Sequence, residues 1–249
     1  MLKRNGLVYG AVLAWLAGAI SPVAFAQQGT PLPKFGLELS AGTMGAGIQA
    51  ATAVARKSNV RFGFNYFSYS GSNTSSSNNI TFNGTLKMES AEILFDQYLF
   101  GGFHLSTGMA AYYGNQANGT ASIPAGQTFS LNSANYYSSS ASPVTGTGSF
   151  TASKYAPEVM FGFGNLLPRS NRHFTVNADL GVAFVRSPLI QLNLAGSACT
   201  INSTVGCAPI QSTPSIQSNL VAEQSKLNNQ LGSYLKYWPI IRIGFGYKF

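Results

Sequence analysis

The sequence predicts an all-β fold, a transmembrane antiparallel β-barrel whose strands run up and down through a membrane. Three observations lead to this fold class. From residue 35 onward, segments of roughly membrane-spanning length alternate apolar side chains with polar or small ones. Only 9% of the residues are charged, against about 25% in a typical soluble domain. The segment 237–249 carries the alternation to the last residue, Phe249.

The terminal segment shows the alternation best, because a strand turns successive side chains to opposite faces. One face is apolar or aromatic, and the other is cationic or small. The apolar face holds Ile241, Ile243, Phe245, Tyr247 and Phe249, and the other face holds Arg242, Gly244, Gly246 and Lys248. A lipid-facing wall needs such a division, since a Lys or Arg on that wall costs about 2–4 kcal/mol at the bilayer midplane.

A cleaved signal peptide is predicted over residues 1–26. A positive start, an apolar run over 7–20 and the small-residue pattern Ala24-Phe25-Ala26 indicate cleavage before Gln27. The apolar run is shorter than the ~20 residues that a membrane-spanning helix needs. We therefore expect one domain, the barrel, over residues 27–249.

Eight strands are predicted, an even number as expected for a bacterial barrel. They are Phe35–Ala41, Gly45–Val54, Val60–Tyr69, a segment ending at Leu99, Phe103–Tyr113, Tyr155–Asn165, Phe174–Arg186 and the terminal segment. Ten to twelve strands are the alternative, with extra strands at Thr128–Asn132 and Gly148–Ser153. A single bent strand over Phe35–Val54 would instead break the even count.

The connections are short on one side of the predicted membrane and long on the other, as in bacterial barrels. The long outer loops are 70–78, 114–154 and 187–236. Within the last, apolar residues at helical spacing predict an amphipathic helix over 215–231, which we expect to pack on its own loop. Cys199 and Cys207 lie in the same loop, and an oxidising compartment favours a disulfide between them.

The inner face of the predicted barrel carries acids and bases at alternate positions. They are Glu38, Arg61, Glu92, Asp96, Glu158, Asp179, Arg242 and Lys248. An eight-stranded barrel is just wide enough to be filled by its own side chains. We therefore expect a polar plug, with a gated ion path or proton relay as the alternative.

The sequence offers little for catalysis. It has two histidines, His104 and His173, which we expect to face inward near the inner turns. A Ser-His-acid site needs its three groups within hydrogen-bonding distance, whereas the serines gather in the outer loops. We predict no catalytic residue, no metal ligand and no cofactor. The positive charges form no single patch, which argues against nucleic-acid binding.

Three segments carry a family resemblance: Tyr247-Lys248-Phe249, residues 59–67 and residues 95–103. Through them the chain resembles small Gram-negative outer-membrane β-barrel proteins. The resemblance implies an outer-membrane location among lipid and lipopolysaccharide. It also implies insertion by the barrel assembly machinery, with Phe245, Tyr247 and Phe249 as the recognition signal.

These observations favour a non-enzymatic barrel that makes contacts through its surface loops or supports envelope integrity, with a plugged polar lumen. The alternative is a narrow porin-like channel for ions or small solutes. An enzyme acting on outer-leaflet lipid comes third, because fold alone does not decide between these functions. No surface partner is specified by the sequence.

Overall fold

The computed structural model describes residues 35–76, 79–114, 116–151, 153–186, 189–200 and 206–249. All of them belong to one unit, Leu32–Phe249. The predicted signal peptide lies outside the described residues.

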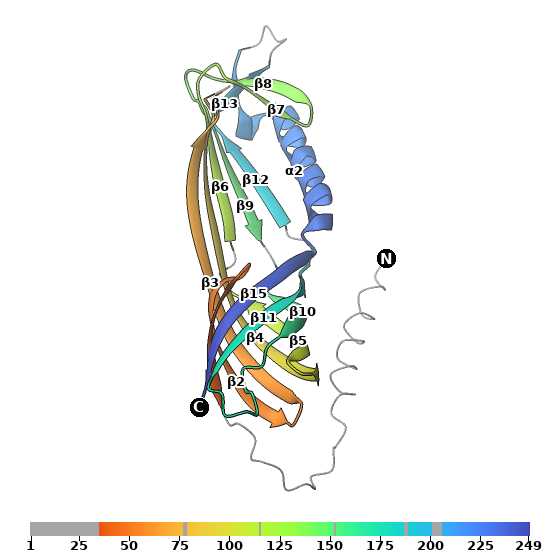
Figure 1. Ribbon diagram of the computed structural model, residues 1–249. Coiled ribbons are helices and arrows are strands. Elements are labelled where there is room, and N and C mark those ends of the chain that lie inside the picture. Colours follow the sequence, from red (N-terminus) through yellow and green to blue (C-terminus); the bar gives the residue numbers. More distant parts are fainter. Residues whose placement is uncertain (1–34, 77–78, 115, 152, 187–188, 201–205) are drawn as a thin grey trace, which may run out of the picture. The chain divides into compact units, whose positions relative to one another are not determined.

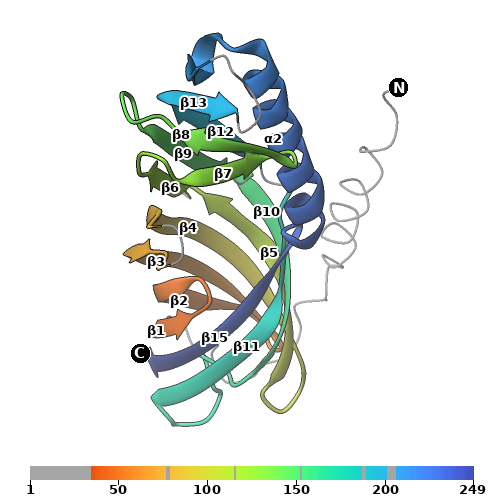
Figure 2. The ribbon, with the colours of Figure 1, turned by 90° about the horizontal axis from the view of Figure 1, so that it is seen from above.

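Eight antiparallel strands form a closed ring (Figures 1 and 2). In ring order they are β1 (Gly36–Gly42), β2 (Gly45–Ala55), β3 (Ser58–Thr74), β4 (Thr81–Phe100), β5 (Phe103–Tyr112), β10 (Tyr155–Phe163), β11 (Phe174–Phe184) and β15 (Tyr237–Lys248). The terminal strand β15 closes the ring by pairing with β1, from Gly36 opposite Lys248 to Gly42 opposite Arg242. The predicted barrel of eight strands is confirmed.

The outer wall of the ring is apolar because each strand alternates. Phe64, Phe161 and Leu180 leave 58%, 56% and 62% of their surface exposed. Their neighbours in sequence, such as Asn65 and Asp179, are buried in the interior. A wall of exposed apolar side chains around a polar interior suits lipid.

The first outer connection is a tight hairpin between β1 and β2. Gly45 has φ +95°, and a Cβ there would lie 2.2 Å from the backbone oxygen of Tyr66. Glycine permits both the positive φ and the close approach. Residues 35–54 therefore form two strands rather than one bent strand.

Strand β3 extends beyond its predicted outer end at Tyr69 to Thr74, and β3 and β4 have 17 and 20 residues. A membrane-spanning strand needs only about 9–11. Three further strands, β6 (Gln116–Ile123), β9 (Val144–Thr151) and β12 (Leu189–Ala195), add in that order to the outer half of β4 (Figure 1). Much of the predicted outer loops is therefore an extension of the barrel wall.

A smaller sheet, a helix and a disulfide complete the outer structure. The sheet contains β7 (Thr128–Leu131), β8 (Ala134–Ser138), β13 (Ser197–Thr200) and β14 (Ala208–Pro209). The 3-10 turn η1 (Ile210–Ser212) leads to the helix α2 (Pro214–Tyr234), so the predicted helix is confirmed. The predicted disulfide joins Cys199 to Cys207.

Helix α2 packs on its own surroundings, as predicted. Ile216 and Leu220 are buried in an apolar cluster with Ile123, Val144 and Ile210. The helix also covers the free edge of β12 with hydrogen-bonding side chains, an arrangement that blocks pairing with another strand. Among the described residues, no helix is both long and apolar enough to cross a membrane.

Candidate functional site

The centre of the barrel interior is a buried charge network around Arg61. Its Nε lies 2.8 Å from Asp96 Oδ2, and its Nη1 lies 2.9 Å from Asp179 Oδ2. Nη2 donates to Ser106 Oγ at 3.0 Å, and Ser106 in turn donates to Asp96 at 2.6 Å. One guanidinium on β3 thus ties four strands, β3, β4, β5 and β11, together through ion pairs and charge-assisted hydrogen bonds.

Arg242 holds the neighbouring part of the network. Its Nη2 lies 2.7 Å from Glu92 Oε2, and its Nη1 lies 3.7 Å from Asp179. Gln49 links the two parts: it donates to Glu92 at 3.1 Å and accepts from Arg61 at 3.2 Å. The network therefore crosses the full interior of the ring.

Two buried acids, Glu38 and Glu158, have no ion-pair partner in the described part of the chain. Asn177 donates to Glu38, and the Tyr112 hydroxyl donates to Glu158 at 3.2 Å. The other oxygen of each carboxyl group has no hydrogen bond. Among the described interior residues, the acids therefore outnumber the two paired arginines.

Lys248 does not join the network, although the sequence placed it on the same face. Its ammonium group donates to the carbonyl oxygens of Pro168 and Ser170, at 2.9 and 2.6 Å. These residues belong to the connection between β10 and β11. Because Lys248 ends the terminal strand, its long side chain reaches this connection more readily than the centre of the ring.

The outer end of the interior is closed by apolar side chains that sequence reasoning did not single out. Met44, Met88, Leu94, Met160 and Ile240 pack together, each with at most 6% of its surface exposed. A signal was present, because Leu94 and Met160 share the parity of the inner-facing acids on their strands.

The inner end is closed by a connection that the sequence presented as a simple turn. Leu166 and Leu167 leave 2% of their surface exposed and pack against Ala51 of β2. Asn165 fixes this segment, since its Oδ1 accepts from the backbone of Leu167 at 2.9 Å and from Asn59 at 3.3 Å. The interior is therefore filled at three levels.

Arg169 also anchors the connection between β10 and β11, because it donates to the backbone oxygen of Ala55 at the end of β2, at 2.9 Å. Partial burial, together with the charge of Arg56, lowers the pKa of the Arg169 guanidinium from its ordinary value. The group still carries its charge at neutral pH, because an arginine pKa starts far above 7.

The histidines do not form a catalytic arrangement. His104 is buried, with Nε2 3.1 Å from Asp179 and Nδ1 3.2 Å from the carbonyl oxygen of Gly102. Both ring nitrogens are occupied, so neither is placed to activate a serine. His173, expected to face inward, is instead exposed and stacks on Tyr247. No cluster of metal-binding side chains occurs among the described residues.

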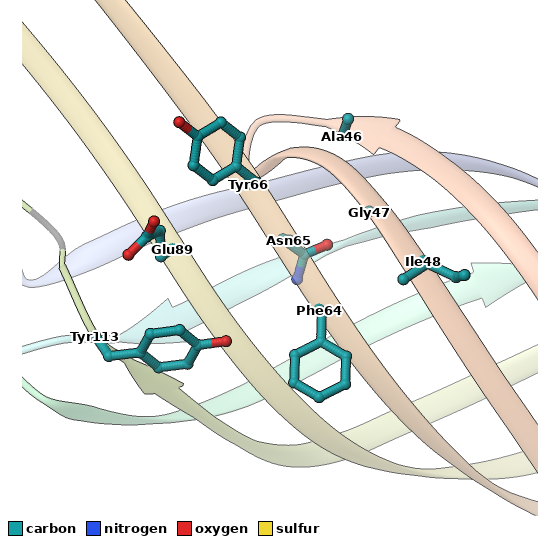
Figure 3. A pocket seen from close by; sticks show the side chains of 8 residues that line it. All are labelled: Ala46, Gly47, Ile48, Phe64, Asn65, Tyr66, Glu89 and Tyr113. Atoms are coloured by element: carbon teal, nitrogen blue, oxygen red, sulfur yellow. The ribbon is translucent and has the colours of Figure 1, made fainter.

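A shallow groove of about 380 Å³ lies on the outer wall rather than in the lumen (Figure 3). Ile48, Phe64, Tyr66 and Tyr113 give it an apolar and aromatic lining, with Glu89 at one side. Glu89 is paired with Lys87 at 2.8 Å. The groove therefore combines an apolar surface with a neighbouring charged pair.

The three aromatic residues of the expected assembly signal lie on the exposed face of β15 and at its end. Phe245 and Phe249 leave 68% and 66% of their surface exposed. Tyr247 packs edge-on against Phe249, with ring centroids 5.0 Å apart. Their role in insertion stays a prediction.

No protein-family model matches the chain, and a search of curated proteins finds no match. Solved structures do match. CarO from Acinetobacter baumannii is 20% identical with a TM-score of 0.56, over 90% of this chain and 100% of CarO. Acinetobacter baumannii CarO2 is 18% identical with a TM-score of 0.58, over 88% of this chain and 100% of CarO2.

A major outer membrane protein from Thermus thermophilus is 14% identical over 87% of this chain and 99% of that one. Its TM-score of 0.39 is too low to support an argument. The predicted resemblance is confirmed at the level of the fold: the chain has the β-barrel fold of the CarO outer-membrane proteins.

Proposed function

We propose that the chain is a non-enzymatic outer-membrane barrel with a plugged lumen, whose folded outer structure makes surface contacts or supports envelope integrity. The observation that carries this proposal is the filling of the interior at three levels. Leu166 and Leu167 lie at the inner end, the Arg61 network at the centre, and the Met88 cluster at the outer end.

The outer structure supports a role in contacts. Its strands extend the barrel wall, and α2 and the Cys199–Cys207 disulfide hold the smaller sheet. Such a folded platform presents a fixed surface at lower entropic cost than disordered loops. The predicted signal peptide over residues 1–26 supports export, and the aromatic residues Phe245, Tyr247 and Phe249 support insertion by the barrel assembly machinery.

Planar-bilayer recording of the purified full chain tests the plug. We expect no steady unit conductance, because neither end of the interior is open to a column of water. A steady conductance that Arg61→Gln or Asp96→Asn alters would overturn the proposal, since a conducting path would then pass the charge network.

A narrow channel is the second candidate, favoured by one observation. Glu38 and Glu158 are buried without an ion pair in the described residues, so the interior has an excess of acids. A channel built on them would prefer cations. The reversal potential in a salt gradient would show that preference, and Glu158→Gln would weaken it.

An enzyme remains the third candidate, and cells that express the protein can test it. We expect unchanged lipid A and phospholipid, because both nitrogens of His104 are engaged. Modified lipid that disappears with His104→Ala would contradict the non-enzymatic proposal.

A further inference from the structure

The outward face of the β3–β4 hairpin changes in character along its length. Within the barrel wall it presents Phe64 and Ile93, which are exposed apolar side chains. Farther out come Tyr66 and the Lys87–Glu89 pair beside the groove of Figure 3. Beyond these, every outward residue of the two strands is Ser, Thr or Asn.

Strands β6, β9 and β12 widen this polar region into a sheet face. The register aligns outward residues into rows across five strands, for example Ser72, Asn83, Thr120, Thr147 and Asn193. We call the three outermost such rows, from Ser70 to Gln191, from Ser72 to Asn193 and from Thr74 to Ala195, the hydroxyl face.

The hydroxyl face is uncharged. Apart from Ala195 at the edge, its members are all Ser, Thr, Asn or Gln. Neighbouring strands place these groups about 4.8 Å apart, and successive rows lie about 7 Å apart. The face is therefore a regular lattice of hydroxyl and amide groups.

The side chains of the hydroxyl face use only part of their hydrogen-bonding capacity on one another. Ser70 and Thr85 share one hydrogen bond at 3.1 Å, and Asn83 donates to Thr120 at 3.4 Å. A hydroxyl can donate one bond and accept two, and an amide can do more. Exposed groups such as Thr120 and Thr147 can bond further to a hydroxyl-rich partner.

We infer that the hydroxyl face binds the saccharide of a glycolipid anchored in the surrounding outer leaflet, namely lipopolysaccharide. The same strands meet lipid lower down, so a glycolipid seated against the wall holds its sugars at this height. Acyl chains would lie along Phe64 and the groove, phosphate would lie near Lys87, and sugars would bond to the lattice. The vertical order of surfaces on β3 and β4 matches the order of groups in such a molecule.

The lattice fits lipopolysaccharide better than it fits a protein partner or a soluble saccharide. A protein partner would be expected to meet aromatic or Arg side chains at the centre of its interface, and the hydroxyl face has neither. A soluble saccharide would gain nothing from the apolar groove. Continuity with the lipid-facing wall therefore favours a membrane-anchored sugar.

The inference deepens the surface-contact role proposed above and rests on it. The test places the full chain in phospholipid nanodiscs that contain either lipopolysaccharide with core sugars or the matching lipid A without them. Native mass spectrometry counts the glycolipid retained per barrel. We expect lipopolysaccharide to be retained several-fold more than lipid A. Conductance through the lumen does not involve the hydroxyl face. A negative result for glycolipid retention can therefore be distinguished from a negative result for the plugged lumen.

Matched variants assign the binding to the face. Thr120→Glu/Thr147→Glu should abolish the several-fold preference, because two acids repel phosphorylated sugars and occupy the lattice. Thr128→Glu/Ser130→Glu, on the exposed side of β7, should leave it unchanged. Thr120→Val/Thr147→Val removes the hydroxyls while keeping shape and strand propensity, and should reduce the preference with the fold intact.

Four results would overturn the inference. The first is equal retention of lipid A and lipopolysaccharide, and the second is an equal effect of both glutamate pairs. The third is full competition by the released core saccharide, which would show that the membrane anchor contributes nothing. Cross-linking between copies through Thr120→Cys would likewise identify a second copy of the chain as the occupant.

Discussion

At the scale of single residues, Arg61 holds the interior together. It contacts Asp96, Asp179, Gln49 and Ser106 while almost wholly buried. Replacing it by Gln would leave the buried Asp96 without a cation and Asp179 with Arg242, 3.7 Å away, as its remaining arginine, and breaking a buried pair costs about 3–5 kcal/mol. We expect Arg61→Gln to lower the free energy of unfolding by that amount in urea titrations followed by gel mobility.

Lys248→Gln is the matched control for Arg61→Gln. It also removes a cation that faces carbonyl or carboxylate oxygens, but Lys248 lies at the rim beside an exposed turn. Water can replace its partners there, so the loss should be about 1 kcal/mol. Equal losses for the two variants would show that the central network does not act as a buried unit.

Two glycines test how tightly the interior is packed. A Cβ at Gly162 would lie 2.2 Å from His104 Nε2 and 2.3 Å from Asp179 Oδ1, whereas a Cβ at Gly84 meets nothing within 4 Å. Gly162→Ala should cost about 1–3 kcal/mol through overpacking. Gly84→Ala, in the outer extension, should gain about 0.5–1 kcal/mol. Urea titrations should therefore show a lower free energy of unfolding for Gly162→Ala and a higher one for Gly84→Ala.

The sequence allowed only part of the site to be predicted. Side-chain parity assigns residues to a face because the period of a strand is a geometric fact. Which groups pair across the ring depends on side-chain length and on strand order. Nothing local in the sequence therefore showed that Arg61 meets Asp179 of β11, or that Lys248 turns away toward Ser170.

At the scale of elements, α2 protects the free edge of β12. Asn228 accepts from the backbone of Ile190 at 2.8 Å and donates to its carbonyl oxygen at 3.1 Å, while Gln224 accepts from Leu192 at 3.0 Å. We expect Asn228→Leu to cost about 1–3 kcal/mol locally, because it leaves the Ile190 backbone groups unpaired.

Hydrogen exchange measures the Asn228→Leu effect directly. The amides of Leu189–Ala195 should exchange faster in the variant, while the ring strands keep their protection. Ser225→Ala, at an exposed position on the same helix, should change amide exchange neither in β12 nor in the ring strands. Unaltered exchange in β12 would mean that the edge is held by other contacts.

The strands of the outer extension share one composition, and sequence reasoning offered only part of β9 among them, as the alternative strand Gly148–Ser153. The ring strands are recognisable because their outward residues are apolar and their inward ones polar. In β6, β9 and the outer half of β4, the outward residues are polar. The other face of the sheet carries glycines such as Gly84, Gly119 and Gly148, which are paired with one another across the strands. Hydropathy hardly alternates there, so most of this sequence resembles polar loops, and the register of the folded sheet establishes the strands.

At the scale of the whole molecule, the three levels of filling act in series. The Met88 cluster, the Arg61 network and the Leu166–Leu167 segment each close the interior, so removing one level leaves two others. The barrel should therefore tolerate the loss of one level without conducting. What should change is how far small molecules penetrate from that end.

A thiol at the centre makes this penetration measurable. Ser106 is fully buried, and Ser106→Cys keeps its shape and a weak hydrogen-bond donor. In the otherwise unchanged chain we expect no reaction with a small membrane-impermeant thiol reagent added on either side. Leu166→Gly/Leu167→Gly should open the inner level, so that the reagent reacts from the inner side only. The native cysteines, joined as a disulfide, stay silent. Labelling of the unaltered barrel from either side would mean that its interior already admits water-borne solutes.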